Sequence, residues 1–186
     1  MKRLASAMII LVILTGCSGE SGEMQRGLAL RSALLKASEC RFSCDVTADY
    51  TDRTYTFSMD CRCDSQGNLT FAVTSPETIA GITGSIGEDG GKLTFDDTAL
   101  QFDLMADDRI SPVGAPWVLM KTLRGGCITS AGMDGGGLRL SIDDSYDDDA
   151  LHLDIRLGEG DRPEAADILF EERRILSLSI KNFDIV

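Results

Sequence analysis

The sequence predicts a mainly β protein with some helix (α+β), built as a curved antiparallel sheet or incomplete β-barrel of about eleven strands. From Cys40 onward, apolar and polar residues alternate in short runs, which is the period of a half-buried strand. Most runs are joined by turn residues with no helical pattern between them, and this favours antiparallel neighbours. Helical patterns occur before the first strand and midway along the chain, so we expect an N-terminal helix and a short internal helix on the concave face.

The first residues are typical of an export signal. A basic pair precedes the apolar run 4–14, which is too short to span a bilayer comfortably. The sequence Leu14-Thr15-Gly16-Cys17 then resembles the bacterial lipobox, whose cysteine receives a diacylglyceryl group with fatty acids such as palmitate. We therefore expect residues 1–16 to be a lipoprotein signal peptide and residues 17–22 a tether lipidated at Cys17. The alternative is an ordinary secretory signal with an incidental thiol.

The net charge of the chain disfavours two classes of partner. The chain carries 18 basic and 30 acidic residues, a net charge of −12, and loss of the basic pair with the leader makes it more acidic still. Such a surface repels phosphate backbones and anionic headgroups, so nucleic acid and electrostatic membrane docking are disfavoured. We expect the lipid to attach the protein to the membrane and residues 23–186 to form one domain with a sizeable core.

Residues 23–38 are expected to form an amphipathic helix, because apolar residues recur at helical spacing and basic residues lie between them. Its apolar residues are Met24, Leu28, Leu30, Leu34 and Leu35.

Two alternating runs, 40–50 and 55–63, predict a hairpin joined by the loop 51–54. The register depends on which residues face one another at the loop. We expect Tyr50 to face Tyr55, which would align the two runs residue by residue.

Four cysteines lie in this hairpin. In the expected register Cys44 falls directly opposite Cys61, at a spacing that small adjustments bring to disulfide distance. We expect a Cys44–Cys61 disulfide, Cys40–Cys63 as a second pair, and Cys127 as a free thiol, since disulfides are usual in exported proteins. The alternative is buried reduced thiols. The spacing of these cysteines is a poor match to zinc sites, and we expect no metal.

The chain continues as a meander. A helical segment over 112–124, bounded by prolines and closed by glycines, is expected to act as a lid or plug. The further strands are expected around 69–73, 79–86, 93–95 and 100–104 before this helix, and around 127–133, 138–142, 151–157, 165–170 and 175–180 after it.

Three stretches carry a family resemblance: Tyr55 to Cys61, Gly67 to Phe71, and Ser75 to Gly84. With the predicted layout, they resemble the LolA/LolB-type lipoprotein carriers, and most of all the lipid-anchored branch found in clostridia. The resemblance implies an incomplete β-barrel whose apolar groove holds acyl chains. In this chain the groove would be lined or gated by Ile79, Ile82, Trp117, Leu119 and Met120. The alternative is that these residues fill a closed core.

Catalytic residues are scarce. The chain has one histidine, His152, on the polar side of a strand and with no serine elbow, so we expect a non-enzyme without a cofactor. The acidic run Asp143 to Asp149 has the oxygen ligands that calcium favours, but it lacks the glycine and glutamate of an EF-hand loop. The alternative is a solvated turn.

The expected function is that of a membrane-anchored extracytoplasmic lipoprotein that binds lipid or lipidated protein in an apolar groove. The alternative is a protein-interaction or assembly factor of the cell envelope with a filled groove, because a fold does not fix a function. Its location would be the outer leaflet of the cell membrane or an outer membrane.

Overall fold

The computed structural model describes residues 19–186 except 50–52, 97, 103–104, 107–108 and 148. The expected leader, the lipidation site Cys17 and the loop residue Tyr50 therefore lie outside the described residues. Among the residues that are described, no helix is long and apolar enough to cross a membrane.

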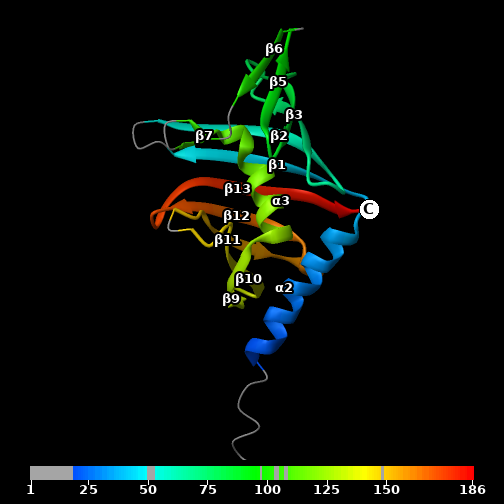
Figure 1. Ribbon diagram of the computed structural model, residues 1–186, viewed down its shortest axis with the longest axis vertical. Coiled ribbons are helices and arrows are strands. Elements are labelled where there is room, and N and C mark those ends of the chain that lie inside the picture. Colours follow the sequence, from blue (N-terminus) through cyan, green and yellow to red (C-terminus); the bar gives the residue numbers. More distant parts are fainter. Residues whose placement is uncertain (1–18, 50–52, 97, 103–104, 107–108, 148) are drawn as a thin grey trace, which may run out of the picture.

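Eleven strands form one curved antiparallel sheet that does not close (Figure 1). Helix α2 precedes the sheet and α3 crosses its concave side, so the predicted architecture, an incomplete β-barrel with an N-terminal helix and a short internal helix, is confirmed. The strands are β1 (Glu39–Asp49), β2 (Thr54–Asp64), β3 (Leu69–Ser75), β4 (Thr83–Gly87), β5 (Gly90–Phe95), β6 (Thr98–Phe102), β9 (Cys127–Asp134), β10 (Gly137–Asp143), β11 (His152–Leu157), β12 (Pro163–Phe170) and β13 (Arg173–Ile185). The helices are α2 (Gly19–Lys36) and α3 (Ala115–Gly125), with short 3-10 turns at Pro112–Gly114 and Glu159–Asp161.

The order of strands across the sheet is β6-β5-β4-β3-β2-β1-β13-β12-β11-β10-β9. The first and last strands thus pair at its centre, which the sequence did not predict, and β6 and β9 form its edges. Asp45 of β1 accepts a hydrogen bond from Lys181 of β13 at 2.8 Å. A separate two-stranded sheet, β7 (Met105–Ala106) and β8 (Arg109–Ile110), was also not predicted.

The β1–β2 hairpin has a different register from the expected one. Asp49 pairs with Thr54, so Cys40 lies opposite Cys63, and Cys44 lies opposite Met59 rather than Cys61. The expected register was therefore wrong by two residues. A shift of two leaves every side chain on its original face, so the alternation of apolar and polar residues does not distinguish the two registers.

Helix α3 fills the concave side of the central strands. Pro116 stands in its first turn, where a missing N–H costs nothing, and Gly126 follows its end. The buried residues of α3 are Ala115, Pro116, Trp117, Val118, Leu119, Met120, Thr122 and Leu123. They share one core with the inward side chains of β1–β3 and β10–β13, so the segment is a plug and not an open lid.

Helix α2 packs against β9, β10 and α3. Gly27 allows the approach, since a Cβ there would stand 2.9 Å from Leu140. The buried residues Leu30, Leu34 and Ala37 form the inward stripe, whereas Leu28 and Leu35, expected on the same face, are 48% and 54% exposed. Arg31 holds the helices together, donating to the carbonyls of Leu123 at 2.9 Å and Gly126 at 2.7 Å.

Truncating Leu119, which is fully buried on α3, should destabilise the fold by about 2–5 kcal/mol in a Leu119→Ala variant, because it leaves a cavity. Urea denaturation measures this free energy of unfolding. Leu100→Ala, at a side chain that is 58% exposed, is the matched control and should cost under about 0.5 kcal/mol. Equal effects of the two changes would contradict a packed α3.

Candidate functional site

The concave side of the sheet divides into a filled part and an uncovered part. In the filled part, Trp117 is 6% exposed and Leu119 and Met120 are almost fully buried. The indole of Trp117 donates to the Gly67 carbonyl at 3.1 Å, which fixes α3 to the turn between β2 and β3. Three of the expected groove residues therefore stand in the core.

The uncovered part lies on the arm, which we define as β4 to β6 and which projects beyond the main body of the sheet (Figure 1). Register and alternation place five apolar side chains of the arm and its approach on the concave side. We call them the apolar strip; they are Ile82, Leu93, Phe95, Leu100 and Phe102. Phe95 is 43% exposed and Leu100 is 58% exposed, while the other three are half-buried.

The expected groove residues Ile79 and Ile82 lie where the arm leaves the body. Both are half-buried and pack against the edge of the core. The structure thus separates the expected groove residues: Ile82 belongs to the apolar strip, Ile79 lies beside it, and the α3 residues lie in the core. The role of Ile79 and Ile82 as a groove lining stays a prediction.

A pocket of about 370 Å³ opens between the end of α2, α3 and the β2–β3 turn. The ammonium group of Lys121 lies 5.4 Å from the centre of the Trp117 ring. The same group lies 3.9 Å from a carboxylate oxygen of Asp144. Arg124 donates to the Asp64 carbonyl at 2.9 Å. Since both signs of charge line the pocket and its cations already have partners, it suits an acyl chain poorly.

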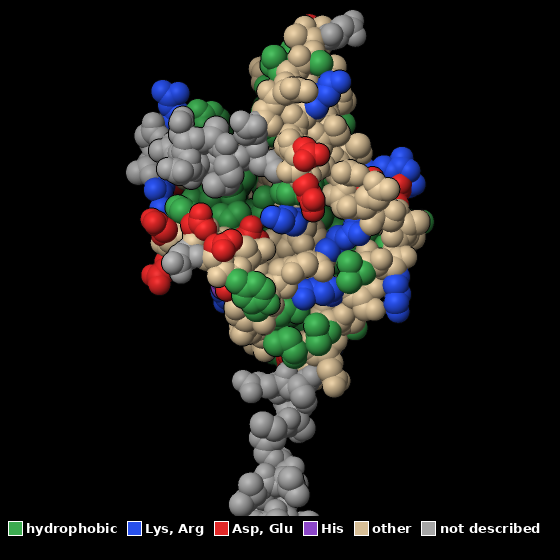
Figure 2. Space-filling model, in the orientation of Figure 1, with side chains coloured by type: hydrophobic (Ala, Val, Ile, Leu, Met, Phe, Trp, Pro, Cys, Tyr) green, Lys and Arg blue, Asp and Glu red, His purple; other side chains and the backbone are tan. Residues whose placement is uncertain are grey.

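Exposed apolar side chains also gather outside the concave side, over α2 and the neighbouring strand β9 (Figure 2). Leu28 and Leu35 come from α2, Met133 from β9 and Tyr146 from the turn after β10. Their exposed fractions are large, and Tyr146 is 91% exposed. Single exposed apolar residues are ordinary, so this surface alone indicates no ligand.

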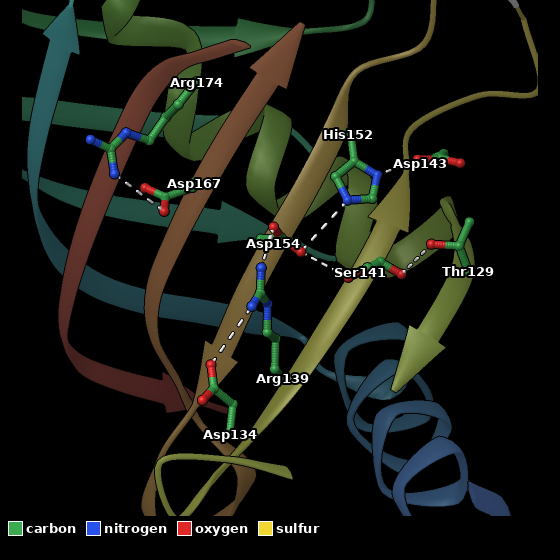
Figure 3. A network of polar contacts seen from close by, with 9 residues as sticks. All are labelled: Thr129, Asp134, Arg139, Ser141, Asp143, His152, Asp154, Asp167 and Arg174. Atoms are coloured by element: carbon green, nitrogen blue, oxygen red, sulfur yellow. Dashed lines mark hydrogen bonds and ion pairs between the residues drawn. The ribbon is translucent and has the colours of Figure 1, made fainter. Parts of the chain in front are cut away.

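The convex side of β9–β13 carries a polar network (Figure 3). Asp154 accepts hydrogen bonds from Arg139 at 2.6 Å and from Ser141 at 2.8 Å. His152 has one ring nitrogen 2.7 Å from Asp143 and the other 3.6 Å from Asp154. Burial favours a higher pKa for the Asp154 carboxyl, but Arg139 and Ser141 stabilise the carboxylate more strongly, so its pKa is lowered.

His152 is half-buried on the polar side of β11, as expected from the alternation, but it is flanked by two carboxylates. Ser141 donates to Asp154 and not to the imidazole, so the Ser141 hydroxyl is not paired with His152 as a nucleophile with its base. The acidic run does lie at a hairpin turn, where Asp144 accepts from the Leu151 amide at 2.8 Å. Within the described ranges, no group of three or more His, Cys, Asp or Glu residues is placed to hold a metal ion.

The four hairpin cysteines face the concave side and are buried, and Cys127 is half-buried. All five are thiols in the structure. The corrected register removes the basis on which Cys44 was expected opposite Cys61, and it makes Cys40 and Cys63 the directly opposed pair. The disulfides themselves stay predictions.

The chain is similar to known proteins in structure only. No family model and no curated protein matches its sequence. It is similar to an uncharacterized conserved protein from Thermus thermophilus, with 10% identity, a TM-score of 0.49, and 88% of this chain and 87% of that chain covered. It is also similar to a LolA superfamily protein from Nitrosomonas europaea, with 8% identity, a TM-score of 0.48, and 86% and 93% covered.

A third likeness is to a chain in the structure of the CwlD amidase from Clostridioides difficile in complex with the GerS lipoprotein. The identity is 12%, the TM-score is 0.44, and 85% of this chain and 92% of that chain are covered. Likenesses this distant carry no information about ligand, partner or activity.

Replacing the central carboxylate of the network, Asp154→Asn, should lower stability by about 1 kcal/mol near pH 7. A carboxyl whose pKa is lowered by folding stabilises the protein at pH values above its ordinary pKa of 3.8. This contribution is lost as the pH falls through the lower pKa of the folded state. The difference from the parent should therefore shrink as the pH is lowered below 3.8. Urea denaturation near pH 7 and at a pH well below 3.8 measures it.

Asp134→Asn is the control, because Asp134 is 65% exposed and lies 3.7 Å from the same Arg139. It should change stability by less than about 0.5 kcal/mol at either pH. A loss in Asp154→Asn that persists unchanged at low pH would rule out the charge as its cause.

Proposed function

We propose that this protein is a non-catalytic, lipid-anchored factor of the cell envelope that binds a protein partner through its arm. Residues 1–16 would be the signal peptide, Cys17 the lipidated residue and residues 17–22 the tether of the domain 23–186. The protein would act outside the cytoplasm, at the surface of the membrane that holds its lipid.

The observation that carries this proposal is the burial of α3 along the concave side. Eight of the eleven residues of α3 are buried, including Leu119 at 0% exposure. An acyl chain lying beneath α3 would have to displace these side chains and lose their packing. The filled concave side therefore supports the protein-binding alternative over a carrier that holds its lipid under α3.

The arm offers what an extended peptide needs. Among the described strands, β6 has a neighbour, β5, on one side only, so its outer backbone groups can pair with an added strand. Phe95 and Leu100 stand exposed beside this edge on the concave side. We therefore expect the partner to contribute an extended segment whose apolar side chains cover the strip, with basic residues that suit the acidic chain.

The second candidate function is lipid binding on the arm itself. Ile79 extends the apolar strip toward the core, and a bound acyl chain would gain about 0.8 kcal/mol for each buried methylene. This version of the carrier function leaves α3 in place. It predicts a lipid, and not a peptide, against Leu100.

Photo-crosslinking separates these two candidates. A photoreactive phenylalanine in place of Leu100 in the full-length protein, irradiated in intact cells, should yield an adduct that migrates as a larger protein. The same group in place of Lys92 is the control, because Lys92 is exposed on the convex side of the arm. It should give at most about a tenth of the adduct.

An adduct of lipid mass at position 100 would overturn the protein-binding proposal in favour of the arm as a lipid site. Equal adducts at positions 100 and 92 would mean that the contact is not made by the apolar strip.

Lipidation has its own test. Cells grown with labelled palmitate should incorporate the label into the parent protein and not into a Cys17→Ala variant, because only the lipobox cysteine would carry the diacylglyceryl group. Cys127→Ala should keep the label. A label retained in Cys17→Ala, detected after gel separation, would contradict the expected anchor.

A further inference from the structure

The β1–β2 hairpin contains an inward-facing ladder of four cysteines. Cys40 and Cys44 come from β1, Cys61 and Cys63 come from β2, and none is more than 5% exposed. They belong to the core beneath α3. Their partners in space follow from the register of the hairpin and not from their order in the sequence.

The register of the hairpin favours Cys40 and Cys63 as a disulfide pair. They are directly opposed in the β1–β2 ladder. The backbone of Glu39 exchanges hydrogen bonds with Val186 beside β13, so the alternation of a strand turns the backbone groups of Cys40 toward β2. In such a hydrogen-bonded antiparallel pair the Cα atoms are about 5.5 Å apart, which lies within the range found for disulfides.

Cys44 and Cys61 are placed differently. Cys44 is opposite Met59 and Cys61 is opposite Phe42, so the two cysteines are diagonal neighbours. Diagonal Cα atoms are about 7–8 Å apart, beyond the usual disulfide range. Their thiols still reach one another through a hydrogen bond, which with burial raises the pKa of Cys61.

The opposed pair also has a cation beside it. Arg124 of α3 has one guanidinium nitrogen 4.0 Å from the sulfur of Cys63, held there by its hydrogen bond to the Asp64 carbonyl. Burial raises the pKa of Cys63 to about 11 and raises that of Cys40, and Arg124 opposes both shifts. Once α3 has docked, these thiols are covered and protonated, so oxidation has to occur while the hairpin is still open.

We propose that Cys40 and Cys63 form a structural disulfide across β1 and β2, made as the hairpin folds outside the membrane, and that Cys44 and Cys61 stay reduced. The oxidant would be the disulfide of an extracytoplasmic thiol oxidoreductase. One cysteine thiolate attacks it to give a mixed disulfide, and the second thiolate displaces the enzyme. Two thiols lose two protons and two electrons, and the disulfide of the oxidant becomes two thiols.

The sequence makes this proposal easy to test, because trypsin separates the four cysteines. Cleavage after Lys36, Arg41, Arg53, Arg62 and Lys92 leaves each of them on a different peptide. The full-length protein would be isolated from the envelope, quenched in acid, denatured, alkylated with N-ethylmaleimide and digested without reduction. Mass spectrometry should find residues 37–41 linked to residues 63–92, with Cys44, Cys61 and Cys127 alkylated.

A link between residues 42–53 and 54–62 would overturn the assignment, and so would alkylation of all four hairpin cysteines. Because the peptides are mapped on the parent protein, this result does not depend on any variant folding.

Stability in the presence of a reductant gives an independent measurement. Dithiothreitol should increase the unfolding equilibrium constant of the parent protein by about 100-fold, since reduction frees the closed loop in the unfolded chain. Cys44→Ala/Cys61→Ala should keep this sensitivity, and Cys40→Ser/Cys63→Ser should lose it. Sensitivity that persists in Cys40→Ser/Cys63→Ser would refute the pair.

Discussion

The whole structure depends on covering one apolar sheet face that does not close on itself. A closed barrel buries the inward side chains of its strands against one another, but here the ends of the sheet, β6 and β9, stay apart. Helix α3 supplies the missing contacts over the central strands, and α2 covers the β9 side. Beyond β3 no described helix covers the sheet, so the arm keeps the exposed side chains Phe95 and Leu100.

The sequence predicted the elements better than their pairing. Alternation located the strands that have one buried and one solvated side, such as β1, β2 and β10. The pairing of β1 with β13 and the register of Cys40 against Cys63 were missed, because alternation tells which face a residue takes and not which strand lies beside it. The small strands β7 and β8 were missed because two residues carry no periodic signal.

Candidate residues were predictable by type more than by role. Trp117 and Leu119 were correctly recognised as inward-facing apolar residues, but the sequence could not tell a groove lining from a core, because both need the same side chains. The partners of His152 were missed as well. The pairing of Asp143 with His152 across the β10–β11 turn was accessible in principle from the strand ends, whereas the position of Asp154 beside the imidazole required the structure.

The central pairing of β1 and β13 bears on how the protein is made. Asp45 and Lys181, which join these strands, are separated by 136 residues, so the pairing has a high contact order. If the chain is exported N-terminus first, β1 would leave the membrane early, before β13 has followed. The edge of β1 that pairs with β13 would then lack its hydrogen-bond partners until nearly the whole chain has been exported. During that interval the free edge of β1 is open to mispairing, and a chaperone that binds extended strands would protect it.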